Sequence, residues 1–576
     1  MAERDDRRRL ACWLGEPAEL RAASADPRER GEARFWEGDM DGALAALDEA
    51  ARRDPADPWA LLSRSAVRFR REELDLAEAD AAAFRRLHPD GAAGPAVAAL
   101  LSAARGDAAG ARLNSDEAVS RSGEAAWALA LRGTLSGRWG DLDAARADLD
   151  KALARETLPW ALAARADALN RLGAFWLALE DLDRLRELLP GDPETDVLAA
   201  AIHRDQAQYA DALRRLTRAE TLRPGEARFA KLRSEVLFVQ GKISAAAREL
   251  EKAVRLAPGD ESLRFERVRL LALAGEEDRA EKALGASDLP EASREYLLGY
   301  LRARRGRWKE AEALFARVSA AGDPASGFLR ERAALYRVVA REMPRLKKPA
   351  PPRTKEFRMT GLGYRQPFQT SVEALRFIST CDVLYSNLSD AAVVDFIGLF
   401  GLPFRAIVFR RSDLDAIQCA KDVMPGFRRS RVVGVVTRGH PLFYGRLAYR
   451  LTVMSRRRGY SVRVPASTSI ADTIPALLGL TPSASGGLQV RDGLDLAGLD
   501  PRLPLVLYNF PVSAQARGAL ASRLAASYGP EHPMYLLAGS GDREFSPVET
   551  TTRGLSAALA LADEAVTLFA PERAAR

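Results

Sequence analysis

The first half of the chain alternates apolar and charged positions at helical spacing. A stretch such as ARELEKAVRLAP (247–258) carries Leu, Val or Ala at every third or fourth position, with Arg, Lys and Glu between them. This is the pattern of an amphipathic helix. From about residue 357 the pattern changes to short β-rich runs, such as RVVGVVT and LPLVLYN, which are separated by helical stretches. The chain is therefore predicted to be an all-α region followed by an α/β domain.

Small residues recur with a period of 34 in the helical half. Alanines stand at this spacing or its double, and Ala178 supplies the missing member one residue early: Ala43, Ala77, Ala111, Ala145, Ala212, Ala246 and Ala280. Glycine and proline keep the same period, as in Gly106 to Gly140 and Pro224 to Pro258. Small residues let two antiparallel helices approach, glycine permits the turn between them, and proline ends the second helix. The period predicts a stack of helix pairs.

In this order of Gly, Ala and Pro the region resembles the tetratricopeptide (TPR) consensus over about 300 residues. A last unit is marked by Gly306, Ala311 and Phe315, so about nine repeats are expected in 24–325, after an N-terminal helical segment in 1–23. The resemblance implies a superhelix whose groove binds a peptide or protein. The alternative is that the array only braces a neighbouring domain.

The segment REMPRLKKPAPPRTKEF is rich in proline and basic residues. Such a composition indicates a semi-rigid linker. We expect a helix end and linker over 326–356, and a second domain over 357–576.

The loops that follow the predicted strands carry the candidate chemistry. Gly361 and Gly363 follow the first strand, TRGHPLFYG (437–445) follows the fourth, and PASTSIAD (465–472) follows the fifth. Ligands bind at the carboxyl ends of strands in open α/β sheets, so these loops are expected to converge on one cleft.

These segments resemble the tetrapyrrole (corrin/porphyrin) methylase superfamily of S-adenosylmethionine (SAM) methyltransferases over about 357–573. The closest likeness is to the borosin type, which N-methylates peptide backbones. It is carried by GLGYRQPFQTSVEALRFISTCDVLYSNLSDAAVVDFI, VVGVVTRGHPLFYG and the stretch beginning GYSVRVPASTSIAD. The resemblance implies a two-lobed α/β domain with SAM between the lobes, no metal, and pairing as a homodimer.

The resemblance also implies a set of cofactor-binding residues. They are Gly361, Gly363, Gly439, His440, Pro441, Tyr444, Ser467, Thr468, Ser469, Asn509 and Phe510. The candidates for a catalytic group are Tyr385, Arg438 and Tyr444, and each has a structural alternative: a half-buried strand residue, a surface charge and a packing residue.

The sequence departs from the borosin pattern in two places. The region 404–424 holds Arg410 and Arg411 but no tyrosine, and Arg438 stands where the pattern has a tyrosine. His440 stands where the corrin-type loop carries Asp. A clamp of tyrosines that orients an amide is therefore not expected in its usual form.

Composition limits the cellular compartment and the partners that are expected for the chain. Hydrophobic residues make up 47% and charged residues 29%, and no apolar run is long enough to span a membrane. Three distant cysteines, Cys12, Cys381 and Cys419, argue against a zinc or disulfide framework and favour the cytoplasm. The net charge of +7 is small for 576 residues. The sequence has no concentrated basic stripe with interleaved aromatics, so a nucleic acid partner is not expected.

The sequence therefore predicts a cytoplasmic SAM-dependent methyltransferase whose TPR array recruits a peptide or protein substrate. Two alternatives stay open: a small-molecule or tetrapyrrole methylase that uses the array for assembly, and a non-catalytic scaffold with a degenerate methylase domain.

Overall fold

The computed structural model describes residues 10–14, 24–320, 327–346, 351–362, 370–386, 391–407, 420–437, 446–464, 489–492, 496, 498–508, 514–538, 548–560 and 566–571. The chain divides into two compact units. The first contains 1–190, 511–523 and 554–562, and the second contains 191–510, 524–553 and 563–576.

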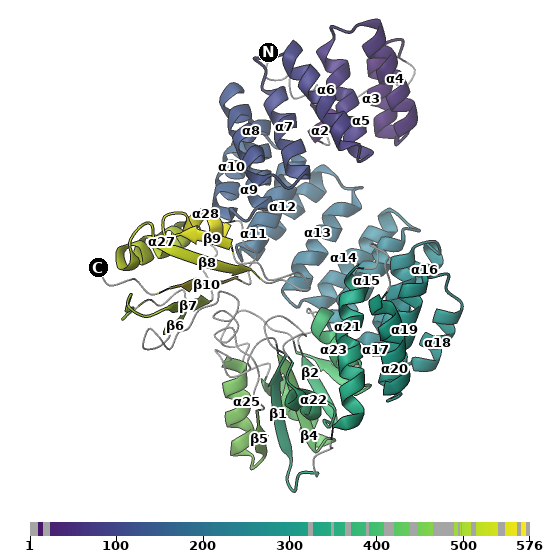
Figure 1. Ribbon diagram of the computed structural model, residues 1–576. Helices are drawn as coiled ribbons and strands as arrows, with labels where there is room; N and C mark the ends of the chain where they lie inside the picture. Colours follow the sequence, from purple (N-terminus) through teal and green to yellow (C-terminus); the bar gives the residue numbers. More distant parts are fainter. Residues whose placement is uncertain are drawn as a thin grey trace. The chain divides into compact units, whose positions relative to one another are not determined.

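Residues 24–320 form nine consecutive helix pairs, five in the first unit and four in the second (Figure 1). The pairs are α3 (Pro27–Glu37) with α4 (Met40–Arg53), α5 (Pro58–Arg70) with α6 (Leu74–Leu87), α7 (Ala93–Ala104) with α8 (Ala108–Arg121), α9 (Ala126–Arg138) with α10 (Leu142–Arg155), α11 (Pro159–Arg171) with α12 (Phe175–Leu188), α13 (Pro193–Asp205) with α14 (Tyr209–Leu222), α15 (Ala227–Val239) with α16 (Ile243–Leu256), α17 (Glu261–Leu273) with α18 (Glu277–Gly285), and α19 (Glu291–Arg304) with α20 (Trp308–Ala320). The short helix α2 (Ala11–Leu14) precedes them, and α21 (Gly327–Glu342) and η2 (Met343–Arg345) follow.

The 34-residue period has the physical basis that the sequence indicated. Gly140 and Gly241 adopt φ of 84° and 83° in the turns inside their pairs, a conformation that favours glycine. A Cβ on Gly133 would lie 2.9 Å from Leu149 Cγ and 3.0 Å from the Ala145 carbonyl oxygen, so only glycine lets α9 approach α10 this closely. The prediction of a helical-repeat array is confirmed.

Arginines on first helices tie neighbouring pairs together. Arg165 donates to Asp181 of its own pair at 2.8 and 2.6 Å and to Asp150 of the preceding pair at 2.8 Å. The same arrangement, with the first acceptor 16 residues ahead, is repeated by Arg64 with Asp80, Arg132 with Asp148, and Arg233 with Glu249. We call these four arginines the arginine ladder. The carboxylate of the arginine's own pair is largely buried, as for Asp181, which is 8% exposed, whereas that of the preceding pair is more open, as for Asp150, which is 46% exposed.

The first sheet of the α/β region is parallel, with strand order β3-β2-β4-β1-β5. Its strands are β1 (Glu356–Gly361), β2 (Val383–Ser386), β3 (Phe404–Ala406), β4 (Val432–Thr437) and β5 (Ser461–Arg463), and its helices are α22 (Val372–Ile378), α23 (Ala391–Gly398), η3 (Met424–Arg428) and α25 (Arg446–Arg457).

Alternation along the strands divides this sheet into two faces. Val432 and Val436 of β4 join one core with residues of α22 and α23, whereas Val433 and Val435 join a second core with η3 and α25. Both faces are therefore covered, as expected for a parallel sheet.

The second sheet has the order β6-β7-β10-β8-β9 and is mixed, because β6 and β7 are parallel and the other pairs are antiparallel. Its elements are β6 (Gln489–Asp492), β7 (Leu505–Tyr508), α27 (Ala514–Tyr528), β8 (Pro533–Ala538), β9 (Val548–Thr551), α28 (Leu555–Ala560) and β10 (Val566–Ala570). Two α/β sheets after an all-α array confirm the predicted fold class. None of the described helices is both long and apolar enough to cross a membrane.

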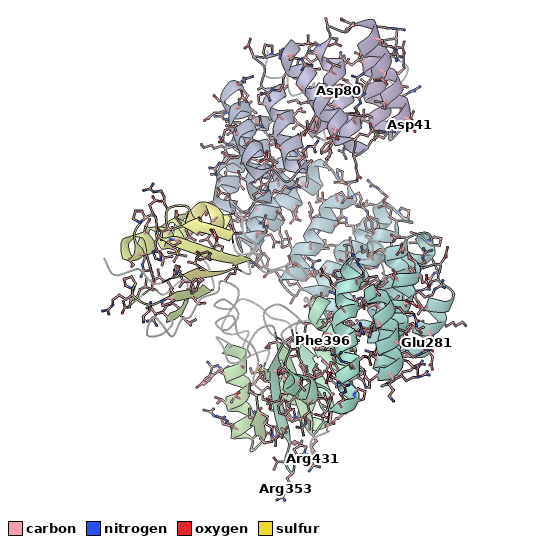
Figure 2. The ribbon with its side chains drawn as sticks, in the orientation of Figure 1. Asp41, Asp80, Glu281, Arg353, Phe396 and Arg431 are labelled. Carbon is pink, nitrogen blue, oxygen red and sulfur yellow. The ribbon has the colours of Figure 1, made fainter. Side chains whose placement is uncertain are left out.

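The last repeats and the first sheet share one hydrophobic core. This core contains Tyr300 of α19 and Tyr336 of α21 together with Phe396 of α23, which Figure 2 labels where α23 meets the array helices. The rings of Tyr336 and Phe396 lie 6.4 Å apart, and those of Trp308 and Phe400 lie 6.2 Å apart. The sequence predicted a linker between the two regions and did not predict this shared core. The domain boundaries themselves stay predictions.

Candidate cofactor site at the carboxyl edge of the first sheet

The order of the first sheet reverses direction between β1 and β4. From β1 the chain moves toward β2 on one side, and from β4 it moves toward β5 on the other, although β1 and β4 are neighbours. The connecting helices α22 and α25 consequently lie on opposite faces, as their membership of the two cores shows. At such a switch point the loops diverge and leave a crevice outside the carboxyl ends of the strands, where α/β proteins bind ligands.

Gly361 and Thr437 are partners at the carboxyl ends of β1 and β4. The Leu362 N–H donates to the Thr437 carbonyl at 3.1 Å, which extends the pairing to the last described residue of each segment. Glycine is the residue type that allows a ligand to approach the backbone most closely. Gly361, which the sequence analysis names as a cofactor-binding candidate, therefore lies at the switch point.

Hydroxyl groups gather near the same strand ends. Ser386 of β2 donates to the Val436 carbonyl at 3.0 Å, and Thr370 donates to the Leu362 carbonyl at 3.4 Å. The Thr360 hydroxyl is buried and has no hydrogen-bond partner within the described part of the chain. A buried hydroxyl without a partner is costly, so a ligand or a neighbouring loop that bonds it would be stabilised. Sequence reasoning missed Thr360 and Ser386, because Thr and Ser at strand ends are common turn residues.

Tyr385, the catalytic candidate on β2, points away from solvent into the core with η3 and α25. Its hydroxyl lies against Gly426, where a Cβ would come within 2.8 Å. Burial raises the pKa of Tyr385, and nearby Arg405 offsets this in part. The phenol therefore stays protonated at neutral pH and is suited to donate a hydrogen bond more than to act as a base.

The remaining predicted site residues lie outside the described part of the chain. These are Gly363, Arg438, Gly439, His440, Pro441, Tyr444, Ser467, Thr468, Ser469, Asn509 and Phe510. Their segments begin next to described strand ends: 438–445 follows β4, 465–488 follows Val464, and 509–513 follows β7. Their roles stay predictions. Among the described residues no three His, Cys, Asp or Glu side chains converge as metal ligands would.

A buried ionic cluster holds α23 on the array side of this sheet. Asp395 of α23 accepts from Arg269 of α17 at 2.5 Å and from Arg332 of α21 at 2.6 Å. Arg304 of α19 donates to the Gly398 carbonyl at 2.5 Å. Sequence reasoning missed Asp395. It is the single charge in the apolar run AAVVDFIGLF, and a lone charge in such a run is a signal that could have indicated a buried ion pair. We call Asp395, Arg269 and Arg332 the junction cluster.

Glycines permit this close contact. A Cβ on Gly398 would overlap the Tyr300 hydroxyl and lie 2.6 Å from Leu273 Cδ2. Gly401, with φ of 63°, packs against the Arg304 carbonyl. The chain's own helix α23 and the residues that follow it thus pack directly against α17 and α19.

No protein-family model and no curated protein matches the chain. Among solved structures, a tetratricopeptide repeat protein from Parabacteroides merdae ATCC 43184 is similar at 20% identity and a TM-score of 0.34, over 42% of this chain and 96% of that chain. Uroporphyrin-III-C-methyltransferase from Thermus thermophilus is similar at 21% identity and a TM-score of 0.31, over 38% of this chain and 92% of that chain. The methyltransferase CobJ is similar at 16% identity and a TM-score of 0.30, over 39% of this chain and 96% of that chain. At these scores none of the likenesses identifies a reaction or substrate for this chain.

Proposed function

We propose that the chain is a SAM-dependent methyltransferase that binds its cofactor in the crevice between β1 and β4. The observation that carries this is the reversal of strand order at Gly361 and Thr437, where the glycine-bearing and Gly-His-Pro segments both leave the sheet. The glycine at position 361, and the Thr360 hydroxyl, which has no partner among the described residues, fit a ligand rich in hydrogen-bonding groups.

The chemistry asks little of the protein beyond positioning. SAM, when bound, supplies a methyl group on a sulfonium, and holding an acceptor in line with it is worth about 7–11 kcal/mol of the barrier. Gly361 and the hydroxyls at the strand ends would hold and orient the cofactor. Covered on both faces, the sheet provides a rigid support for them.

Calorimetric titration with SAM tests the cofactor assignment. Gly361→Leu should abolish binding, because its side chain would fill the crevice, whereas Gly259→Leu, in a repeat turn with open space around it, should bind like the unchanged chain. Binding by Gly361→Leu with undiminished affinity would show that the cofactor site lies elsewhere.

We further propose that the acceptor is a peptide or protein recruited by the array. Seven helix pairs precede the two whose first helices hold α23, so the array is longer than bracing of the first sheet requires. Asp167 stands three periods before Arg269 on the equivalent helix, and its side chain is 60% exposed, whereas that of Arg269 is 11% exposed. The equivalent faces of earlier repeats are thus available for another chain.

A paired substitution tests the recruitment. Asp167→Arg on α11 should raise the KM for the natural peptide or protein acceptor with kcat unchanged, and Asp183→Arg on α12, 56% exposed, should change neither. If the chain methylates a porphyrinoid and no peptide, with both variants unaffected, the peptide proposal is wrong while the SAM site stands.

A further inference from the structure

The amino edge of the first sheet carries a dense basic surface. In a parallel sheet all strands begin at the same edge, so the segments that enter β1, β4 and β5 lie near one another. These segments are 351–355, 420–431 and 455–460, and together they contain nine cations and one carboxylate, Asp422. We call this surface the basic edge.

Folding assembles the basic edge from short clusters that are far apart in the sequence. They are Arg353 and Lys355, then Lys421, Arg428, Arg429 and Arg431, then Arg456, Arg457 and Arg458. All nine are exposed, and none forms an ion pair with another residue that the structure describes. Contacts across the edge include the hydrogen bond from the Arg431 guanidinium to the Arg353 carbonyl, 3.0 Å, and Figure 2 labels these two residues together.

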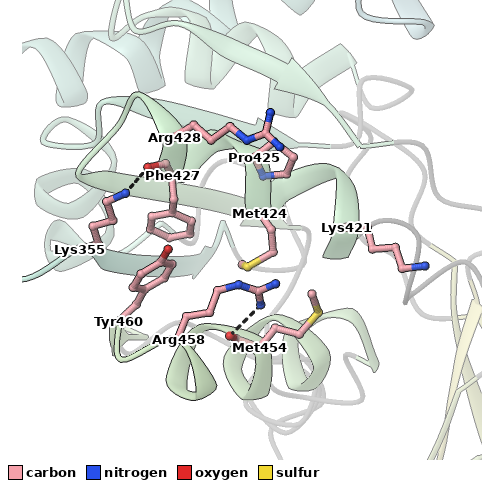
Figure 3. A pocket seen from close by; sticks show the side chains of 9 residues that line it. All are labelled: Lys355, Lys421, Met424, Pro425, Phe427, Arg428, Met454, Arg458 and Tyr460. Carbon is pink, nitrogen blue, oxygen red and sulfur yellow. Dashed lines mark hydrogen bonds between the residues drawn. The ribbon is translucent and has the colours of Figure 1, made fainter.

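An open pocket of about 390 Å³ lies in the basic edge (Figure 3). Met424, Phe427, Met454 and Tyr460 give it an apolar and aromatic wall, and Lys355, Lys421, Arg428 and Arg458 supply the charge. The Phe427 and Tyr460 rings lie 4.5 Å apart, which fixes one side of the wall. This pocket is at the opposite end of the strands from Gly361, so it is separate from the proposed cofactor site.

The hydrogen-bonding groups of the pocket select the ligand. Its side chains offer donors and no carboxylate or amide acceptor. The carbonyls of Phe427 and Met454 already accept from Lys355 at 2.6 Å and from Arg458 at 3.2 Å. A peptide backbone brings an N–H donor at nearly every residue, whereas a phosphodiester backbone brings only acceptors. Guanidinium groups match phosphate oxygens in pairs, and a flat base can lie against an apolar or aromatic wall.

We propose that the basic edge binds single-stranded nucleic acid, with one base in the pocket and neighbouring phosphates on the surrounding arginines. This goes beyond the proposed methyltransferase function and does not depend on it. The sequence shows no continuous basic stripe, because this surface exists only after the three segments come together.

Fluorescence anisotropy with a labelled 15-residue oligouridylate tests the proposal. The double variant Arg428→Glu and Arg458→Glu should bind roughly tenfold more weakly or worse at low salt, and should reduce the slope of log K against log salt by roughly 1.4, about 0.7 for each lost phosphate contact. The control pair Arg112→Glu and Arg248→Glu, exposed residues on array helices, should leave both quantities unchanged. All variants carry surface substitutions, and equal melting temperatures verify that they fold.

Two competitors distinguish nucleic acid binding from the binding of an acidic peptide or a small molecule. An oligoglutamate of equal charge should compete poorly, and uridine monophosphate should compete only at far higher concentration than the oligonucleotide. Equal competition by oligoglutamate would make the surface an acidic-peptide site. Equal competition by the mononucleotide would make it a small-molecule site, and unchanged binding by the double variant would place the nucleic acid elsewhere. Each of these three results overturns the proposal.

Discussion

The arginine ladder and the junction cluster use the same chemical pair in different surroundings. In the ladder, Arg165 is 20% exposed and bridges carboxylates of two neighbouring helix pairs. In the junction cluster, Asp395 is 6% exposed and pairs with one arginine from the array helix α17 and one from α21, beside buried tyrosines. The ladder sets how one repeat stacks on the next, whereas the junction cluster selects one particular neighbour, α23. A repeat array can therefore be built uniformly and still become specific at its end.

Removal of the Asp395 carboxylate should cause the largest loss of stability among the substitutions that compare the junction cluster with the arginine ladder. Asp395→Ala leaves Arg269 and Arg332 buried without their shared carboxylate, and should lower the free energy of unfolding by about 3–5 kcal/mol. Asp278→Ala removes a carboxylate that is fully exposed on α18 and should leave stability unchanged. Thermal unfolding of the full chain compares the two. Equal melting temperatures would mean that the junction cluster contributes nothing.

The close contact between Gly398 and Tyr300 gives a second test of how tightly α23 packs at the junction. Gly398→Ala places a methyl group onto the Tyr300 hydroxyl and should cost about 1–3 kcal/mol. The Tyr300 hydroxyl has no hydrogen-bond partner among the described residues, so Tyr300→Phe should be well tolerated and should restore part of the loss. A double-mutant cycle measures the coupling. An additive cycle would show that α23 does not press on α19.

A ladder rung should matter less than the junction. Arg165→Ala leaves Asp181, 8% exposed, without its paired donor and should cost about 1–3 kcal/mol. Arg146→Ala removes an exposed arginine on α10, paired with Asp150 at 3.5 Å, and should change little. Urea unfolding of both variants provides the measurement, and a loss for Arg165→Ala as large as that for Asp395→Ala would erase the distinction drawn above.

The smallest expected effect concerns the rate at which the Cys381 thiol is alkylated. Cys381 lies in the shared core, and burial raises the pKa of its thiol to about 12. At pH 8 almost no thiolate is present, so Cys381 should resist alkylation in the native chain and react after unfolding. Peptide mapping by mass spectrometry follows this site separately from the other cysteines. Rapid native labelling of Cys381 would indicate that the core opens easily.

Periodic features were predictable from the sequence and pairwise ones were not. The 34-residue spacing of Ala, Gly and Pro reports local helix packing, which repeats along the chain, so the array followed from it. The strand–helix alternation of the second half followed from its short β-rich runs. The junction cluster joins Asp395 to residues 126 and 63 positions earlier, and nothing periodic links them. The basic edge arises because parallel strands start together, which requires knowing the strand order. At the proposed cofactor site, Gly361 was predictable as a strand-end glycine, but its partner Thr437 depends on register.

Hydrogen–deuterium exchange with and without SAM tests the central claim most directly. If the cofactor binds at the β1/β4 switch point, amides in 361–372 and 437–446 should gain protection in the presence of SAM, while those of the basic edge and of α3 to α12 keep their rates. Protection confined to the basic edge or the array, with none after β1 and β4, would contradict the assignment of this crevice as the cofactor site.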